Sequence, residues 1–376
     1  MPNWKFLDIS PDVLMAEDCS HIVPMRGVSF IDDDDDDDDC HLAFQLCECN
    51  LHDYVRNVFK DVHHNVILET RYTLRWQNLI QGMLQAVHHI HSNKKAHADL
   101  NPCKILISNN CVKIGGMTRC KELDPESRDS DYFDLARNEL HIFTNGRHVF
   151  TNERNSLGGL DVDELFRNLQ SLRNYLPEIH DAISKLLYPS ERILVGIDDV
   201  NIKLLPWLMG HPSLWSPEKR INFFIEVSNS LFEDRGSWQY ANDVENCYNC
   251  GDWSKVFHPS VIKALERIKV DGNTILYEYD KFSLTSLLRF IRNIFGHTIK
   301  TFFRAKFNGA RTGYRISRHD LNFESVERIL RYFYPGLLIS LYYAIHRNLY
   351  RIPTVSRLHG CIDGFVFDFS ILLFGG

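Results

Sequence analysis

A long helical pattern that leads into two short apolar strands is the feature that most limits how this sequence can fold. Between Leu74 and Ser92, apolar residues recur at the spacing of a buried helix. They are Leu79, Ile80, Met83, Leu84, Val87 and Ile90. Residues 104–108 and 111–115 are apolar runs that flank Asn109-Asn110, a pattern that predicts a β-hairpin. The sequence therefore predicts a domain that combines helices with a small sheet.

The residues that link this helix to the hairpin resemble the catalytic loop of protein kinases. His97-Ala98-Asp99-Leu100 matches the start of the motif His-Arg-Asp-Leu-x-x-x-Asn in sequence and in place. Asp99 stands where the catalytic base would be, but Lys104 replaces the metal-binding Asn, and Gly116 stands where the first residue of Asp-Phe-Gly would bind the metal. We find neither a glycine-rich loop nor a Val-Ala-Ile-Lys lysine. The resemblance therefore implies a pseudokinase lobe, in which Asp99 and His97 shape a turn rather than catalyse, and it argues against ATP or ADP binding.

A second feature is the positive charge of the region between Lys281 and His319, which contains nine Lys or Arg and no Asp or Glu. Such a field suits phosphates, and Arg289, Lys300 and Arg304 within it are candidate RNA-binding residues. Residues 283–297 predict an amphipathic helix. A plain solvated basic face is the alternative interpretation.

One face of that predicted helix gathers groups that suit phosphodiester cleavage. Arg289, Asn293 and His297 recur every four residues, with Arg292 beside them. Guanidinium and amide groups can donate to phosphate oxygens, and an imidazole can transfer protons near neutral pH. This is an inventory for cleavage without a metal.

The same residues resemble the signature of the kinase-extension nuclease (KEN) domain. The match is Tyr279 followed by Ser283-Leu284-x-x-Leu287-Leu288-Arg289-x-x-Arg292-Asn293-x-x-x-His297. This domain occurs in the unfolded-protein-response sensor kinase/endoribonuclease and in RNase L, the 2′,5′-oligoadenylate-dependent ribonuclease, to which the degraded kinase lobe is more similar. Further matches are Gly210 to Trp215 at the junction, Asp252-Trp253 at a buried tryptophan, and Tyr334 to Leu338 at the start of the last helix.

The resemblance implies a metal-independent endoribonuclease that acts on single-stranded or loop RNA. It implies that His297 protonates the leaving 5′-oxygen, that Tyr279 assists deprotonation of the attacking 2′-hydroxyl, and that Arg292 with Asn293 holds the phosphate. The products would be 2′,3′-cyclic phosphate and 5′-hydroxyl ends, no cofactor would be needed, and DNA would not be cut because it lacks the 2′-hydroxyl. The active form would be a homodimer, or a heterodimer with a related full-length protein.

The predicted fold class is α+β and mostly helical. We assign residues 22–209 to a degenerate kinase-like domain with an incomplete small lobe and residues 210–351 to an all-α nuclease domain, and we leave 1–21 and 352–376 unassigned. A strand is predicted at 21–30, and residues 40–55 are predicted to be a second strand that runs through a short turn into the start of a helix. Residues 121–131 are predicted to be a loop. Further helices are predicted at 132–143, 162–175, 178–187, 200–209, 218–232, 260–269 and 325–348.

Two other functions compete with the nuclease. The missing small lobe and sensing parts favour a catalytically silent regulator that dimerises with an active full-length relative. The intact set of Tyr279, Arg292, Asn293 and His297 favours the enzyme. An active serine/threonine protein kinase conflicts with Lys104 and Gly116.

Three overall features of the chain limit its possible partners and compartment: its charge, its cysteines and its hydropathy. The net charge is −7, but eight of the 49 acidic residues form the run Asp32–Asp39, and the other 41 balance 42 basic residues. We interpret this run as a solvated hairpin loop, with a cation-binding tract as the alternative. Ten scattered cysteines favour a reducing, cytoplasmic location, and the lone Cys247/Cys250 pair is more typical of a loop than of a metal site. We expect no secretory signal and no membrane span, because the longest apolar stretch covers only residues 365–374.

Overall fold

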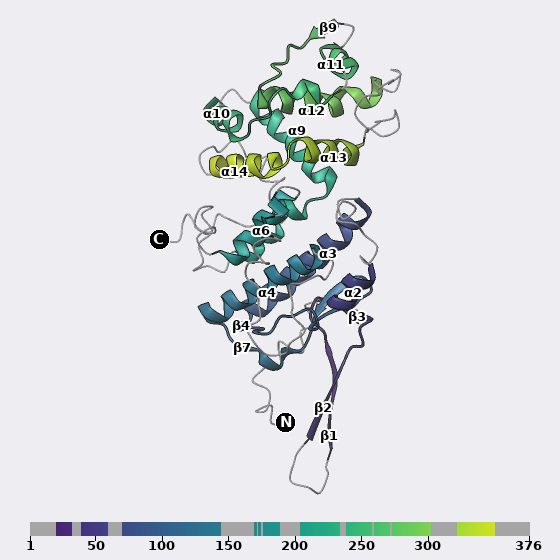
Figure 1. Cartoon of the computed structure of the whole chain (residues 1–376), viewed down its shortest axis with the longest axis vertical. Coiled ribbons are helices and arrows are strands. Elements are labelled where there is room, and N and C mark those ends of the chain that lie inside the picture. The colour runs from purple at the N-terminus through teal and green to yellow at the C-terminus, as the bar shows by residue number, and fades with distance from the viewer. Residues whose placement is uncertain are drawn as a thin grey trace. The chain divides into compact units, whose positions relative to one another are not determined.

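The computed structural model describes residues 20–31, 39–58, 70–143, 169–170, 172–173, 176–188, 204–233, 238–257, 259–270, 273–301 and 322–349. The chain divides into two compact units (Figure 1). Unit 1 comprises Met1–Arg173 and Ile179–Leu214, and unit 2 comprises Asn174–Glu178 and Trp215–Gly376. The change at Leu214 lies a few residues beyond the boundary that the sequence predicts at residue 210.

The core of unit 1 is built on the long helix α3 (Thr70–Ser92) (Figure 1). The side chains of Met83, Ala86, Val87 and Ile90 in this helix are fully buried. The helix packs against the sheet strand β6 (Cys111–Ile114) and against the helices α4 (Pro125–Phe143) and α8 (Leu204–Met209). The helix predicted from the apolar spacing is therefore confirmed, and it begins slightly earlier than predicted.

A small antiparallel sheet lies beside α3. Its strand order is β3-β5-β6, with β3 at Cys49–Asn50, β5 at Ile105–Ser108 and β6 at Cys111–Ile114. Asn109 and Asn110 both have positive φ, at 53° and 61°, a conformation that favours Asn in tight hairpin turns. The predicted hairpin is confirmed. The short strands β4 (Lys95–Ala96) and β7 (Lys121–Glu122) form a second antiparallel pair.

The two strands predicted near the N-terminus also form. β1 (Met25–Ile31) and β2 (Asp39–Phe44) pair antiparallel and make a long two-stranded ribbon (Figure 1). Residues 32–38 of the acidic run between them lie outside the described part of the chain. Both interpretations of the run therefore stay predictions.

The prediction of a loop at 121–131 is wrong, because helix α4 (Pro125–Phe143) begins within these residues. Asp124 caps this helix: its Oδ1 accepts the N–H of Ser127 at 2.7 Å, and the Ser127 hydroxyl oxygen accepts the N–H of Asp124 at 3.0 Å. Pro125 suits the first helical position, where no N–H is required. Local capping thus starts the helix before its apolar face begins.

The other described helices before residue 215 are α2 (Leu51–Val58), α6 (Pro177–Leu187), α8 (Leu204–Met209) and the 3₁₀ turns η2 (Met117–Arg119) and η5 (Pro212–Leu214). The helix predicted at 178–187 is confirmed by α6. The helix predicted at 200–209 corresponds to α8, with residues 200–203 outside the described part. Most of the helix predicted at 162–175 also lies outside it.

Unit 2 is mostly helical, but the all-α prediction is wrong. β8 (Arg267–Val270) and β9 (Asn273–Leu276) form an antiparallel hairpin in which Val270 pairs with Asn273. The predicted helix at 260–269 accordingly ends at Leu265, as α11 (Pro259–Leu265). The sequence between the strands is Asp271-Gly272, which favours a two-residue hairpin.

The other helices described in unit 2 pack around a core that contains the fully buried Phe223, Trp253 and Phe290. They are α9 (Pro217–Glu233), α10 (Trp238–Cys247), α12 (Leu284–Thr301), α13 (Phe323–Phe333), α14 (Leu337–Leu349) and the 3₁₀ turn η6 (Trp253–Lys255). α9 contacts α12 and α13, and α10 contacts α12 and α14. The helices predicted at 218–232 and 283–297 are confirmed, whereas α10 was not predicted.

The single helix predicted at 325–348 is instead two helices, α13 and α14. Pro335 cannot donate the hydrogen bond that a continuous helix needs, and Gly336 has a φ of +85°. Leu337 begins the last helix, as the nuclease resemblance implied. No helix within the described ranges is long and apolar enough to cross a bilayer.

Candidate functional site

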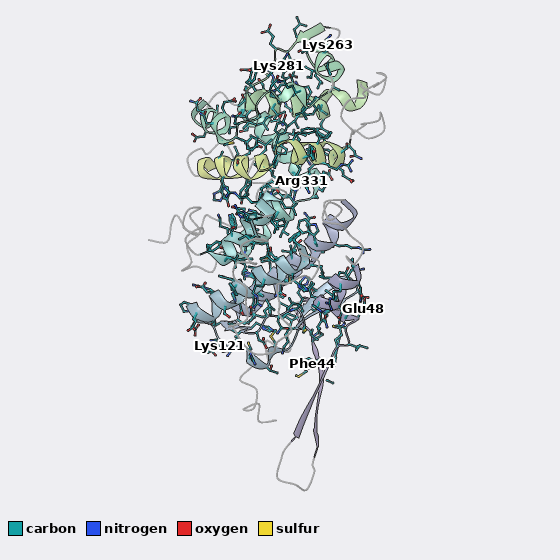
Figure 2. The ribbon with its side chains drawn as sticks, viewed as in Figure 1. Phe44, Glu48, Lys121, Lys263, Lys281 and Arg331 are labelled. Carbon is teal, nitrogen blue, oxygen red and sulfur yellow. The ribbon has the colours of Figure 1, made fainter. Side chains whose placement is uncertain are left out.

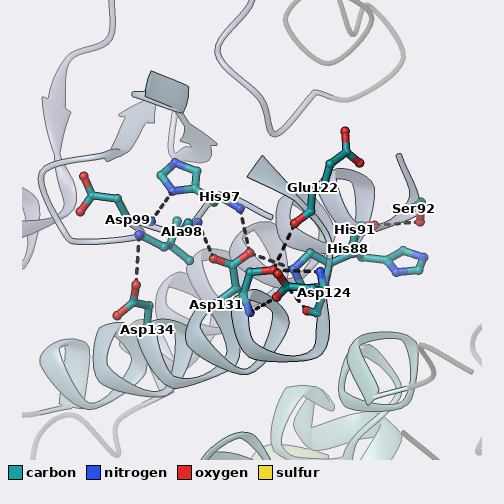
Figure 3. A network of polar contacts seen from close by, with 12 residues as sticks. His88, His91, Ser92, His97, Ala98, Asp99, Glu122, Asp124, Asp131 and Asp134 are labelled. Atoms are coloured by element: carbon teal, nitrogen blue, oxygen red, sulfur yellow. Dashed lines mark hydrogen bonds and ion pairs between the residues drawn. The ribbon is translucent and has the colours of Figure 1, made fainter. Parts of the chain in front are cut away.

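Side chains of α4 hold the kinase-like loop, and the buried carboxylate of Asp131 makes two of the contacts (Figure 3). Asp131 Oδ2 accepts the N–H of His97 at 2.9 Å, and Oδ1 accepts the N–H of Ala98 at 2.8 Å. His91 Nε2 lies 2.9 Å from Oδ2, and the side chains of both His91 and Asp131 are fully buried. These contacts hold Ala98 at a φ of 58°, which residues other than glycine rarely adopt. The shape of the loop is therefore set by helices α3 and α4.

His97 has structural contacts on both ring nitrogens. Its Nε2 lies 3.0 Å from the carbonyl oxygen of Gly115, and the N–H of Asp99 donates to its Nδ1 at 3.3 Å. This pair of partners suits a neutral ring with the proton on Nε2. Burial lowers the pKa of His97, which also favours the neutral form. The contacts support the interpretation that His97 shapes a turn.

The positions that the kinase resemblance gives to metal ligands hold a lysine and a glycine in contact. A Cβ atom on Gly116 would overlap Cδ of Lys104, so the lysine side chain lies directly over this glycine. Lys104 Nζ is 3.8 Å from Asp99 Oδ2, and Arg119 Nε is 3.7 Å from the same oxygen. Two cations thus face the carboxylate in the position of the kinase base. In the ranges that the structure describes, no group of three or more His, Cys, Asp or Glu side chains could hold a metal ion.

In unit 2, the structure brings together Tyr279 and Asn293, which the sequence predicts as catalytic residues. Asn293 Nδ2 donates to the Tyr279 hydroxyl oxygen at 2.7 Å. Asn293 lies on α12 with only 2% of its surface exposed, and Tyr279 is half-buried in the segment before the helix. A buried amide held against a phenol is a preformed polar pair.

Trp253 fixes the segment that carries Tyr279. Its indole Nε1 donates to the carbonyl oxygen of Asp280 at 3.0 Å, and its backbone N–H donates to the carbonyl oxygen of Lys281 at 3.1 Å. The Tyr279 ring meets the Trp253 and Phe290 rings edge to face, with centroids 5.9 and 5.6 Å away. Trp253 is fully buried, as the nuclease resemblance implied, whereas Lys281 is exposed beside it (Figure 2).

The acidity of Tyr279 follows from this packing. Burial raises the pKa of its hydroxyl above the ordinary value near 10, although the hydrogen bond from Asn293 and the charge of Arg289 act in the opposite direction. The phenol is therefore protonated at neutral pH. It can offer both a proton and an acceptor lone pair to a bound group.

The remaining predicted residues lie along α12 or beyond it. Arg292 is half-buried and precedes Asn293 on the helix. The backbone of α12 continues through His297 and Lys300, so His297 lies one turn beyond Asn293. The side chains of His297 and Lys300, and the whole of Arg304, lie outside the described part of the chain.

Glu245 of α10 fixes the start of α12, a role that sequence reasoning missed. Its carboxylate accepts the N–H groups of Leu284 and Thr285, both at 2.9 Å, and the Ser283 hydroxyl at 3.0 Å. These are the donors that a helix leaves unpaired at its N-terminus, and a negative charge is favourable there. No local signal links Glu245 to residues almost forty positions away.

This cap gives a testable expectation for stability. Glu245→Ala should lower the free energy of unfolding of unit 2 by about 1–2 kcal/mol, because the cap to α12 is lost. Urea unfolding followed by hydrogen exchange of α12 peptides measures the change. Glu226→Ala on α9, a half-buried position, is the control and should change stability by less than about 0.5 kcal/mol. Equal effects of the two variants would contradict the capping role.

Comparisons with known proteins place the chain among distant relatives. No protein-family model matches it. It is 21% identical over 291 residues to the serine/threonine-protein kinase/endoribonuclease ire-1 of Caenorhabditis elegans. This match covers 67% of this chain and 28% of that protein. Two probable serine/threonine-protein kinases of Dictyostelium discoideum, ireA and irlB, are 23% and 24% identical over 258 and 334 residues. These matches cover 59% and 76% of this chain.

The chain spans only a fraction of these relatives, between 21% and 28% of their own lengths. A third Dictyostelium protein, the probable kinase irlA, is 22% identical over 348 residues. At this low identity, the chain is related to kinases and kinase/endoribonucleases of the ire-1 type.

Proposed function

We propose that unit 2 is an endoribonuclease of the KEN type, similar to RNase L. It cleaves single-stranded or loop RNA without a metal ion and leaves 2′,3′-cyclic phosphate and 5′-hydroxyl ends. The observation that carries the proposal is the 2.7 Å hydrogen bond between Asn293 and Tyr279, two residues of the predicted catalytic set. The low-identity similarity to a protein named as a kinase/endoribonuclease supports it.

The chemistry of each residue fits a step of that reaction. Tyr279 keeps its own proton and has one lone pair occupied by Asn293. Its other lone pair accepts a hydrogen bond from the attacking 2′-hydroxyl, which positions that group and assists the transfer of its proton to water. Arg292 and the Asn293 amide hold the phosphate and stabilise the charge that develops on its oxygens. His297, one turn further along α12, protonates the leaving 5′-oxygen. Amide, phenol, guanidinium and imidazole groups can perform these steps without a metal.

The test is incubation of the purified chain with a stem-loop RNA in excess EDTA at several protein concentrations. Cleavage should persist in EDTA and leave 2′,3′-cyclic phosphate ends. An RNA with a single 2′-deoxy substitution at the cut position should stay intact there, because the nucleophile is gone. Loss of all cleavage on chelation, with recovery on adding Mg²⁺, would overturn the metal-free mechanism.

Unit 1, in this proposal, is a pseudokinase lobe that controls the nuclease through association. Binding to a second copy, or to a related full-length protein, makes activity depend on protein concentration. The cleavage rate per chain should therefore rise with concentration in the same experiment. A rate per chain that stays constant across the series would remove the dimer requirement.

A variant separates the two units functionally. Asp99→Ala should leave RNA cleavage within about twofold of the parent, and the parent should transfer no phosphate from ATP, because Lys104 and Gly116 occupy the metal positions. Radiolabelled ATP and an RNA cleavage assay on the same preparations measure both activities. Autophosphorylation that disappears in Asp99→Ala would show an active kinase instead.

A further inference from the structure

Arg289 contacts two aromatic rings. Its guanidinium carbon lies 4.9 Å from the ring centroid of Phe232, in the last turn of α9, and 4.6 Å from that of Tyr277, just after β9. Both distances are within the range of cation–π contacts. Its Nε atom is buried and makes no hydrogen bond within the described residues. We call Phe232 and Tyr277 the aromatic clamp.

The ionic surroundings of Arg289 differ from those of two other arginines in unit 2, Arg220 and Arg331. Glu327 binds Arg220 at 2.8 Å and also contacts Arg331, so each of these guanidinium groups lies beside a carboxylate. Within the ranges that the structure describes, Arg289 has no carboxylate partner. Two ring faces stabilise a cation without neutralising it. The positive charge of Arg289 therefore remains available to an anion from outside the protein.

The clamp adjoins the proposed nuclease residues. The rings of Tyr277 and Tyr279 are nearly parallel, with centroids 6.3 Å apart and an interplanar angle of 27°. Arg289 also lies one helical turn before Asn293 on α12, so the two residues share a face of the helix. The uncompensated charge is thus next to the Tyr279–Asn293 pair. Phe232 is 44% exposed, which leaves the clamp open to solvent.

We infer that the aromatic clamp presets the guanidinium of Arg289 as a binding residue for an RNA phosphate next to the one that is cut. This inference rests on the proposed function and names two further residues, Phe232 and Tyr277, that position Arg289. Cation–π contacts with two rings do not use the N–H groups of the guanidinium, which can therefore donate to an anion. Because the side chain is ordered before RNA binds, less conformational entropy is lost on binding.

The test is the affinity for a single-stranded RNA that carries a 2′-deoxy nucleotide at the cut position, measured by fluorescence anisotropy at several salt concentrations. Arg289→Gln should raise Kd about tenfold, the usual effect of losing a charge-assisted hydrogen bond. It should also lower the slope of log Kd against log salt by about 0.7, because one phosphate contact is lost.

The clamp is tested with variants that keep the charge. Phe232→Leu and Arg289→Lys should each raise Kd about two- to fivefold with a near-parental salt slope, because the cation remains but is no longer held by the rings. Phe232→Tyr keeps a ring face and should restore parental affinity. Phe333→Leu removes a comparably exposed aromatic ring elsewhere in unit 2 and is the matched control.

The outcomes separate this inference from the proposed function. Parental affinity and salt slope in Arg289→Gln would overturn the phosphate role of Arg289, and equal behaviour of Phe232→Leu and Phe333→Leu would overturn the clamp. If the parent does not cleave ordinary RNA but these binding differences appear, the clamp stands and the nuclease proposal fails. If the parent cleaves while the binding differences are absent, the nuclease stands and the clamp fails.

Discussion

His297→Ala should lower the single-turnover rate of RNA cleavage by roughly 10²-fold or more, while affinity for the uncleavable RNA changes little. An unperturbed imidazole has a pKa near 6.5, so it can give and regain a proton at neutral pH. A positioned general acid or base typically accelerates a reaction by this factor. Because α12 runs unbroken through His297, the residue lies one turn beyond the buried Asn293, on the side of the helix that carries the proposed site. Single-turnover kinetics with protein in excess measures the chemical step.

Two comparisons make this result specific to proton transfer. Arg292→Ala should impair both binding and rate, and it should lower the salt slope of binding, because a phosphate contact is lost. Added imidazole should partly restore cleavage to His297→Ala but not change the parent, since an imidazolium ion in the vacated position can donate the proton. If His297→Ala cuts RNA at the parental rate, the residue belongs to a basic surface. The chain would then be better explained as a silent regulator of an active relative.

The parts of the fold that the sequence predicts best are those whose cause is local. The hairpin around Asn109-Asn110 combines apolar runs with turn residues that accept positive φ, and it forms as predicted. The cap of α4 and the hairpin of unit 2 have local causes too, in Asp124-Pro125 and Asp271-Gly272. Neither element is in the sequence prediction, although capping residues mark the first and turn residues mark the second.

Contacts between distant residues limit what sequence reasoning can find at the candidate site. Periodicity predicts α12, but it does not indicate that Glu245 caps this helix or that Phe232 covers Arg289. The resemblance to a known domain places Tyr279 and Asn293 in one predicted catalytic set, but their hydrogen bond is seen only in the structure. In the kinase-like loop, the anchoring role of Asp131 depends on a contact with residues 33 and 34 positions away. Such contacts are set by tertiary packing, which a pattern of residue types does not encode.

The stability of unit 1 should fall as pH rises, because α4 buries the carboxyl group of Glu139 and no positive charge in the described part of the chain offsets the cost of ionising it there. Glu139 is 2% exposed, and burial raises the pKa of its side chain to about 8, from an ordinary value near 4.5. Burial also raises the pKa of Asp134 to about 7, although the charge of Arg137 opposes the shift. Both carboxyl groups are therefore protonated in the folded chain at pH 5.

The sign of the pH effect follows from proton linkage. Between about pH 5 and pH 8, the folded state keeps the Glu139 proton and the unfolded state does not, so unfolding releases a proton. In the middle of this window each pH unit lowers the free energy of unfolding by about 1.4 kcal/mol for this group. The change is smaller near both ends, so the total over the window is roughly 3–4 kcal/mol. The stabilisation is complete below pH 4.5 and is lost as pH rises through 8.

Glu139→Gln isolates this contribution, because the amide has a similar shape and carries no charge at any pH. The variant should lose roughly 3–4 kcal/mol less stability than the parent between pH 5 and pH 8, with Asp134 still contributing a residual slope. Urea unfolding followed by hydrogen exchange of α4 peptides restricts the measurement to unit 1. Glu126→Gln, an exposed position on the same helix, should reproduce the parental pH dependence. Parallel curves of unfolding free energy against pH for the parent and Glu139→Gln would show that Glu139 ionises in the folded state as it does in water. The prediction of a buried neutral carboxyl group on α4 would then be wrong.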